Sequence, residues 1–269
     1  MTVSGMSRRL RRAAVLLAVA LLALGAVSIA SAQAGMPKPI TDEADKIHNL
    51  WIFTLAIAAV AFIGVEAAIL YVVFAFRKKN DELPAQTHGS TVVELIWTTI
   101  PVVIVVALFT YSFIVLREVE NTAPDDALTV HVQGFQFQWA FTYDMNDLGT
   151  NTPDRSAEGQ ILIQGTPAQE PTLIIPEGEP VEFTLFSADV IHSFYIPHFL
   201  YKLDVVPGRD NRFVVTPHTL GTYHAQCAEL CGLNHALMRF QLKVVTREEF
   251  DQWVAENAPK PASAVQQAQ

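Results

Sequence analysis

Hydrophobic positions fall into two different patterns along this chain. Three long apolar runs occupy the first 116 residues, whereas the rest alternates short apolar stretches with Pro, Gly and polar residues. Long runs with few charges are typical of membrane helices, and short stretches rich in β-branched and aromatic residues are typical of strands. The pattern therefore predicts an N-terminal membrane region followed by an all-β domain outside the membrane.

The first apolar run has the features of an export signal. Four arginines lie between positions 8 and 12, the run extends from Ala13 to Ala30, and Ala32-Gln33-Ala34 follows it. A basic segment, an apolar core and a small-x-small site are typical of a signal peptide, so we expect residues 1–34 to be cleaved off. An uncleaved membrane anchor is the alternative, because the run is slightly long for a signal.

The second and third runs, residues 50–76 and 92–116, each have the length of a membrane-spanning helix. A helix rises about 1.5 Å per residue and the hydrocarbon layer is about 30 Å thick, so both can cross a lipid bilayer. Glu66 lies well inside the first of these helices. A charge is costly there, so we expect Glu66 to be protonated or to face a partner helix.

The segment between these two helices determines their predicted orientation. It begins with Arg77-Lys78-Lys79, and basic clusters beside membrane helices are typical of the cytoplasmic side. We therefore expect residues 35–123 to form a transmembrane hairpin in a bacterial-type plasma membrane. The cleaved N-terminus and the C-terminal domain are then both predicted on the outer face.

The remainder of the chain predicts a β-sandwich or barrel over residues 124–256. Thr246 followed by Glu248-Glu249 predicts an N-cap and a short helix that ends near Glu256. Residues 257–269, with two prolines and small polar residues, predict a disordered tail. The predicted strands are 129–143, 160–164, 172–175, 180–187, 212–216, 223–226 and 240–245.

Composition and charge narrow the classes of function. The chain is 51% hydrophobic and 17% charged, with a mean hydropathy of +0.27, which favours a membrane protein. Its net charge of −9 argues against a nucleic-acid partner. Residues 118–256 hold 20 acidic residues against 7 basic ones. This acidity suits either ordinary solubility or a docking surface for a basic soluble protein.

The most informative chemistry lies within 12 residues, from Cys227 to Met238. This stretch reads Cys-Ala-Glu-Leu-Cys-Gly-Leu-Asn-His-Ala-Leu-Met and holds two thiols, the imidazole of His235 and a thioether. Soft ligands of this kind select copper, and one Cys with two His and a weak Met is enough for a single copper ion. The second thiol, Cys231, supplies enough ligands for two metal ions bridged by both sulfurs.

A second imidazole is expected from a loop between strands beside the cysteines. His192, in the segment Asp189-Val-Ile-His-Ser-Phe, is the best candidate and lies 35 residues before Cys227. We expect one rival, His224, to be a half-buried residue of a strand. The other rivals are His198 and His218, and the histidines outside the cluster are His48, His88 and His131.

Two other uses of the cysteines remain open. A disulfide between Cys227 and Cys231 is possible in an oxidising compartment, if the geometry allows it. It would leave the neighbouring Met and His unexplained. A structural zinc site fits the Cys and His ligands, but a thioether is a poor zinc ligand.

The C-x-E-x-C-G-x-x-H-x-x-M pattern from Cys227 to Met238 resembles subunit II of the haem-copper cytochrome c oxidases. The similarity extends over essentially the whole chain after the predicted signal. It implies a two-helix transmembrane hairpin that carries an exported cupredoxin-like Greek-key domain with a binuclear CuA centre. By this resemblance, the bridging sulfurs of the two copper ions belong to Cys227 and Cys231.

The resemblance also implies the remaining ligands of the centre. His192 and His235 are the expected terminal imidazoles. Met238 is the expected weak ligand of one copper, and the backbone carbonyl of Glu229 that of the other. The side chain of Glu229 corresponds to a ligand of a magnesium ion shared with the catalytic subunit, and oxygen ligands suit such a hard cation.

Two further motifs match the same family. The segment from Lys202 through Asp204 to Arg209 resembles K-x-D-x-x-P-G-R, which implies contact with subunit I, although an ordinary turn would also use Pro-Gly. The segment from Glu94 to Pro101 resembles E-x-x-W-T-x-x-P, which implies that Glu94 stands where protons enter a pathway into subunit I. A carboxylate that stabilises a helix N-terminus is the alternative role for Glu94.

One segment departs from the family pattern. The family has G-x-Q-W-x-W, in which the first Trp is the usual point where electrons arrive from cytochrome c, and here Phe137 takes its place. The role of Phe137 in electron transfer is therefore in question, and we expect Trp139 to be structural. The chain contains no C-x-x-C-H motif, so we expect no haem in this chain.

These observations predict subunit II of a cytochrome c oxidase. It would accept electrons from a cytochrome c-type donor and pass them to haem in subunit I, where oxygen is reduced to water with proton pumping. The alternatives are a CuA subunit of a nitric-oxide reductase of the same superfamily and an anchored carrier with one copper. A quinol-oxidase subunit without metal is disfavoured, because all the side-chain ligands are present.

Overall fold

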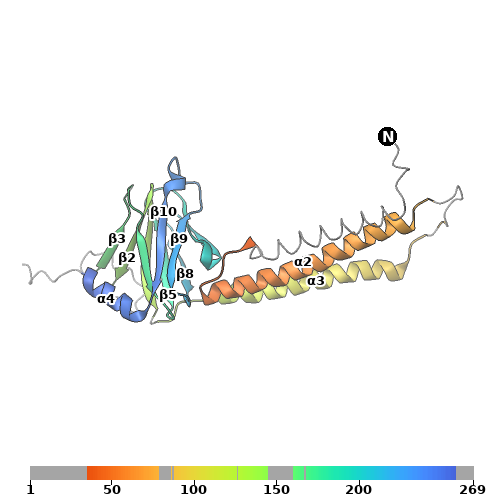
Figure 1. Ribbon diagram of the computed structural model, residues 1–269, viewed down its shortest axis with the longest axis horizontal. Helices are drawn as coiled ribbons and strands as arrows, with labels where there is room; N and C mark the ends of the chain where they lie inside the picture. The colour runs from red at the N-terminus through yellow and green to blue at the C-terminus, as the bar shows by residue number, and fades with distance from the viewer. Residues whose placement is uncertain are drawn as a thin grey trace, which may run out of the picture. The chain divides into compact units, whose positions relative to one another are not determined.

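The structure, a computed structural model, describes residues 35–78, 86, 88–125, 127–144, 160–166 and 168–258. The predicted signal segment, Lys79 and most of the predicted tail lie outside these residues. Among the described residues, a compact unit that begins at Pro39 holds two long helices, ten strands and a short C-terminal helix (Figure 1). This element order agrees with the predicted fold class.

The two long helices are α2 (Asp42–Ala75) and α3 (Thr91–Val119), and both are long and apolar enough to cross a membrane. They run side by side (Figure 1) and touch where the rings of Phe53 and Tyr111 meet edge to face at 5.1 Å. Most of their apolar side chains, together with Glu66, are exposed on the chain. Such a surface suits lipid or the helices of other subunits.

Helix α2 begins eight residues before the apolar run that predicts it. The hydroxyl of Thr41 caps the helix by accepting a hydrogen bond from the backbone N–H of Ala44, at 3.1 Å. The first turn then contacts the β-domain, because Glu43 accepts a hydrogen bond from the N–H of Thr216 at 2.9 Å and Ile40 is buried. Polar residues therefore form the first turns of this helix, which a hydropathy pattern does not detect.

The β-domain is a sandwich of two five-stranded sheets with the strand orders β3-β2-β1-β5-β8 and β4-β10-β9-β6-β7. Neighbours that are distant in sequence, β1 with β5 and β4 with β10, run parallel, and the other paired strands run antiparallel. The strands are β1 (Leu128–Phe135), β2 (Gln138–Asp144), β3 (Gln160–Gln164), β4 (Thr172–Pro176), β5 (Val181–Ser187), β6 (His192–Ile196), β7 (Tyr201–Val205), β8 (Asn211–Val215), β9 (Gly221–Cys227) and β10 (Arg239–Val245).

Aromatic side chains fill the space between the sheets. Phe194 stacks on Phe240 with ring centroids 4.9 Å apart, and Trp139 meets both rings edge to face at 5.7 and 5.5 Å. All three side chains are buried, and burial of one such ring stabilises a fold by about 1.5–3 kcal/mol. This core joins the strands that carry the metal-site residues.

Three features of the β-domain differ from the sequence-based prediction. The single strand predicted over 129–143 is a hairpin of β1 and β2, turning at Gln136 and Phe137, where neither Gly nor Pro marks a turn. Strands β6 and β7 were not predicted, because polar residues interrupt the apolar positions of both segments. As a result, His192 begins a strand instead of lying on a loop.

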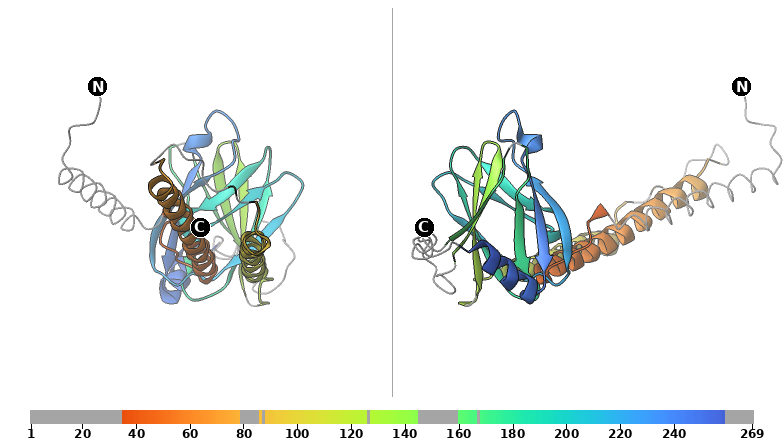
Figure 2. Two further views of the ribbon diagram at one scale, coloured as in Figure 1. Left: turned by 90° about the vertical axis from the view of Figure 1, so that its right-hand side faces the viewer. Right: turned by 60° about the vertical axis from the view of Figure 1, so that its left-hand side comes forward.

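The two ends of the sandwich differ in their structure. The short helix η3 (His235–Leu237) lies in the loop at one end, and α4 (Arg247–Asn257) lies at the other (Figure 2). A capping box between Thr246 and Glu249 starts α4, as the sequence predicts. Trp253 of α4 then packs on Tyr143 with ring centroids 5.0 Å apart.

The buried hydroxyl of Tyr143 joins the two sheets. It donates to the carbonyl of Ile174 at 2.9 Å and accepts from the N–H of the same residue at 2.8 Å. Tyr143→Phe should therefore lower the free energy of unfolding by about 1–3 kcal/mol, because two backbone groups lose their partner. Denaturant unfolding followed by circular dichroism measures this, with Tyr195→Phe as the control. Equal stability of the two variants would contradict the bridging role.

Candidate metal centre

Two neighbouring strands and the loop between β9 and β10 build the metal-site cluster. His192 is the first residue of β6 and Cys227 the last of β9, and these strands pair so that Phe194 lies opposite Cys227. The N–H of Cys227 donates to the carbonyl of Met238 at 2.9 Å and closes the loop. This loop brings Cys231 and His235 back over the end of the sheet.

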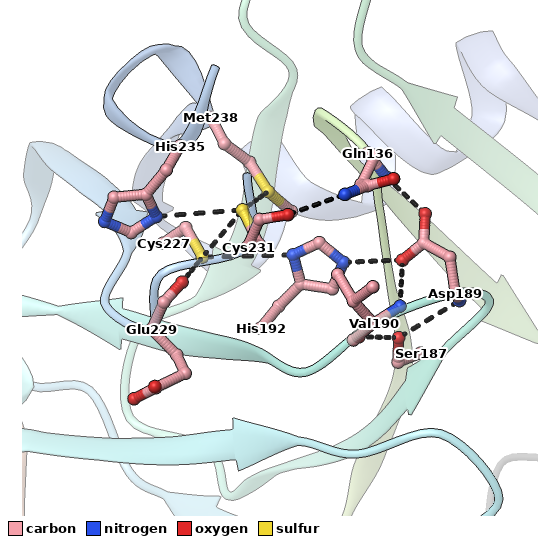
Figure 3. A network of polar contacts seen from close by, with 10 residues as sticks. All are labelled: Gln136, Ser187, Asp189, Val190, His192, Cys227, Glu229, Cys231, His235 and Met238. Carbon is pink, nitrogen blue, oxygen red and sulfur yellow. Dashed lines mark hydrogen bonds and ion pairs between the residues drawn. The ribbon is translucent and has the colours of Figure 1, made fainter. Parts of the chain in front are cut away.

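The four strong candidate ligands and the thioether converge on one spot (Figure 3). The two sulfur atoms of Cys227 and Cys231 lie 3.9 Å apart. The Nδ1 atom of His192 lies 3.9 Å from the Cys227 sulfur, and that of His235 lies 3.7 Å from the Cys231 sulfur. The sulfur of Met238 is 3.8 Å from that of Cys231. The structure therefore brings the ligand residues predicted from the sequence together in a single cluster.

The separation of the sulfurs argues against the disulfide alternative. A disulfide bond is about 2.05 Å long, and both cysteines are free thiols in this structure. The carbonyl oxygen of Glu229 lies 3.3 Å from the Cys227 sulfur, whereas its carboxylate points away from the cluster (Figure 3). One carbonyl, two thiols, two imidazoles and one thioether form a set of donors that suits copper.

The two thiols lie in different electrostatic environments. Burial raises the pKa of Cys227, but its hydrogen bonds with His192, Ser193 and Glu229 together outweigh burial and lower the pKa to about 7. Burial and the nearby Cys227 sulfur together raise the pKa of Cys231. Metal ions bind thiolates, so a cation at this position would replace the proton of Cys231.

The rival histidines have other environments. His198 packs against the ring of Tyr223, and His218 forms an ion pair with Asp45 at 3.0 Å. His224 is exposed on β9, so the expectation that it is half-buried was wrong. Among the described residues, the one group of three or more His, Cys, Asp or Glu side chains close enough to share a metal ion is His192, Cys227 and Cys231.

Phe137 and Trp139, in the segment that differs from the family pattern, have different exposure. Trp139 is fully buried, and its ring lies 6.1 Å from that of His192. Phe137 is half-buried in the turn between β1 and β2, and its ring packs against the loop between β9 and β10. A Cβ atom at Gly232 would lie 2.9 Å from the Phe137 ring, and Gly232 has a φ of +139°. This contact requires glycine at the position after Cys231.

The other predicted functional residues lie on separate elements. Lys202 and Asp204 are exposed on β7, and the exposed Arg209 ends a turn with Gly208 at a φ of +75°. Within the described part of the chain, no ion pair involves any of these three charged side chains. Glu94 lies in the first turn of α3 and is exposed.

Comparison with known families identifies the chain. Residues 128–245 match the model of the periplasmic domain of cytochrome c oxidase subunit II, and residues 30–115 match that of its transmembrane domain. A probable cytochrome c oxidase subunit 2 of Streptomyces coelicolor is 37% identical over 254 residues, which covers 84% of this chain and 79% of the relative. The chain belongs to the cytochrome c oxidase subunit II family.

Relatives from other bacteria extend this similarity. A probable cytochrome c oxidase subunit 2 of Rickettsia bellii is 35% identical over 225 residues, covering 83% of each chain. The crystal structure of the periplasmic domain of subunit II (CoxB) of Bradyrhizobium japonicum is 28% identical and covers 51% of this chain and 96% of that one, with a TM-score of 0.42. Membership of this family makes the chain a component of a haem-copper oxidase, and the family match together with the His and Cys cluster implies a CuA-type copper-binding domain.

The side chain of Met238 tests how the centre is built. Met238→Leu should leave the β-domain folded, with a loss of less than about 1.5 kcal/mol, because the two side chains have similar volumes. The reduction potential of bound copper should rise, since the cupric form loses a donor. Redox titration of the copper-loaded chain measures this shift, with Leu242→Met in β10 as the control. An unchanged potential would show that Met238 only fills space.

Proposed function

We propose that this subunit II binds two copper ions between Cys227 and Cys231. The observation that carries the proposal is the duplication of donors, because each sulfur has its own imidazole and its own weak donor. His192 and the Glu229 carbonyl lie beside the first sulfur, and His235 and Met238 lie beside the second. A site for one copper would need only one such set.

The copper centre supplies a one-electron redox couple when it is loaded. The chain accepts electrons from a cytochrome c-type donor on the outer face and passes them to haem in subunit I, where oxygen is reduced to water with proton pumping. The protein keeps the ligands in place and keeps water away from them. Burial of His192, Met238 and both cysteines supports this role, because at most 4% of each is exposed.

The partners of the subunit follow from its surface. The acidic domain suits a basic donor, and Phe137 lies next to the cysteine loop, where it could receive electrons. Lys202, Asp204 and Arg209 are exposed and form the proposed contact with subunit I. The carboxylate of Glu229 points away from the sulfurs and is available for a magnesium ion shared with that subunit (Figure 3).

A nitric-oxide reductase subunit with the same copper domain is the second candidate from the sequence. The relatives named above are cytochrome c oxidase subunits, which favours the oxidase. Purification of the intact complex and identification of its haems distinguishes the two.

Cys231→Ser tests the proposal directly. Loss of one bridging sulfur should abolish the binuclear copper spectrum while the β-domain stays folded, because the mutated side chain belongs to a loop at the end of the sandwich. Absorption and electron paramagnetic resonance spectra of the purified chain measure the first effect, and circular dichroism measures the second. Normal oxidase activity of the assembled variant complex would contradict the ligand assignment.

Glu94 tests the proposed proton pathway. Glu94→Ala should slow turnover of the assembled oxidase without any change in copper content, because the carboxylate belongs to a helix outside the copper cluster. Loss of a charge at a helix N-terminus costs only about 0.3–1 kcal/mol, so α3 should remain folded. Oxygen consumption and copper analysis of the same preparation measure both effects. An unchanged rate would leave Glu94 with the role of stabilising the helix.

A further inference from the structure

We infer that Asp189 is the positioning residue of the metal centre, which links the His192 imidazole to the cysteine loop. Its two carboxylate oxygens accept hydrogen bonds from three N–H groups that belong to two different parts of the sandwich (Figure 3). The inference rests on the proposed copper site, since it concerns how the ligands of that site are held.

The first oxygen of Asp189 orients the imidazole. Oδ1 accepts from Nε2 of His192 at 2.8 Å, and it also accepts from the N–H of Val190 at 2.6 Å. A proton on Nε2 leaves the Nδ1 atom of His192 with a free lone pair. That atom faces the sulfur of Cys227 (Figure 3), so the carboxylate selects the tautomer that can bind metal.

The second oxygen of Asp189 holds the turn between β1 and β2. Oδ2 accepts from the backbone N–H of Gln136 at 2.6 Å. The side-chain amide of Gln136 then donates to the carbonyl of Cys231 at 2.6 Å. One carboxylate is therefore linked to a His ligand directly and to a Cys ligand through a single intervening residue.

The surroundings of Asp189 support a structural use of this carboxylate. Its hydrogen bonds with His192, Val190 and Gln136 engage both carboxylate oxygens. The hydroxyl of Ser187 accepts from the N–H of Asp189 at 3.3 Å and donates to the carbonyl of Val190, which fixes the bend before β6. His192 itself is fully buried, and within the described residues the hydrogen-bond partner of its Nε2 atom is Asp189.

The experiment compares Asp189→Ala, Asp189→Asn and Asp251→Ala in the full chain in detergent micelles. In the metal-free, reduced protein, nitrogen NMR of labelled histidine should show His192 protonated at Nε2. Asp189→Ala should lose this preference. Asp189→Asn should keep it, because the amide oxygen can still accept from Nε2. The exposed Asp251 of α4 is the control for loss of one carboxylate and should have no effect.

Copper affinity gives the second readout. Competition with a chelator should show copper binding that is about 10- to 100-fold weaker in Asp189→Ala, with most of the affinity restored in Asp189→Asn. Wild-type tautomer and affinity in the Ala variant would overturn the inference. The inference would also be overturned if both variants kept wild-type copper affinity but slowed oxidation of the cytochrome c-type donor equally. Asp189 would then be a residue that contacts the donor. The metal-free readout tests Asp189 even if the wild-type chain does not bind two coppers.

Discussion

Two buried thiols held 3.9 Å apart at one end of the sandwich are the constraint on which the rest of the site depends. Cys227 ends a strand and Cys231 lies on the loop that follows it. Both ends of that loop must therefore be fixed for the two sulfurs to keep this separation without forming a disulfide. The pairing of β9 with β6 and β10 supplies the necessary rigidity, and the hydrogen bond from Cys227 to Met238 closes the loop. The aromatic core beneath the cluster then keeps these strands in register.

The same constraint relates the membrane region to the copper domain. The proposed electron transfer between subunits needs fixed distances, so the domain must be attached firmly to its anchor. The buried Ile40 and Thr41, together with the bond between Glu43 and Thr216, make the first turn of α2 part of the packing of the β-domain. Lys46 and Glu118 add an ion pair between α2 and α3 at 3.5 Å.

Much of the molecule could be predicted from local patterns, and the remainder depended on tertiary contacts. The apolar runs predicted both helices, and four of the five candidate side-chain ligands lie within 12 residues. The sequence also favoured His192 as the fifth, but the pairing of β6 with β9 is what places it beside Cys227. The network of Gln136 and Asp189 was missed, although a carboxylate three residues before a His ligand is a usable signal. The turn at Phe137 was missed because hydrophobic alternation continues through it.

The copper content of the purified, oxidised chain, together with its electron paramagnetic resonance spectrum, tests the two-copper site most directly. The duplicated donors predict two copper ions per chain and a multiline signal from one unpaired electron shared over two nuclei. One copper per chain with the signal of a single nucleus would contradict the two-copper site. A chain without copper, in which the two cysteines form a disulfide, would contradict it as well.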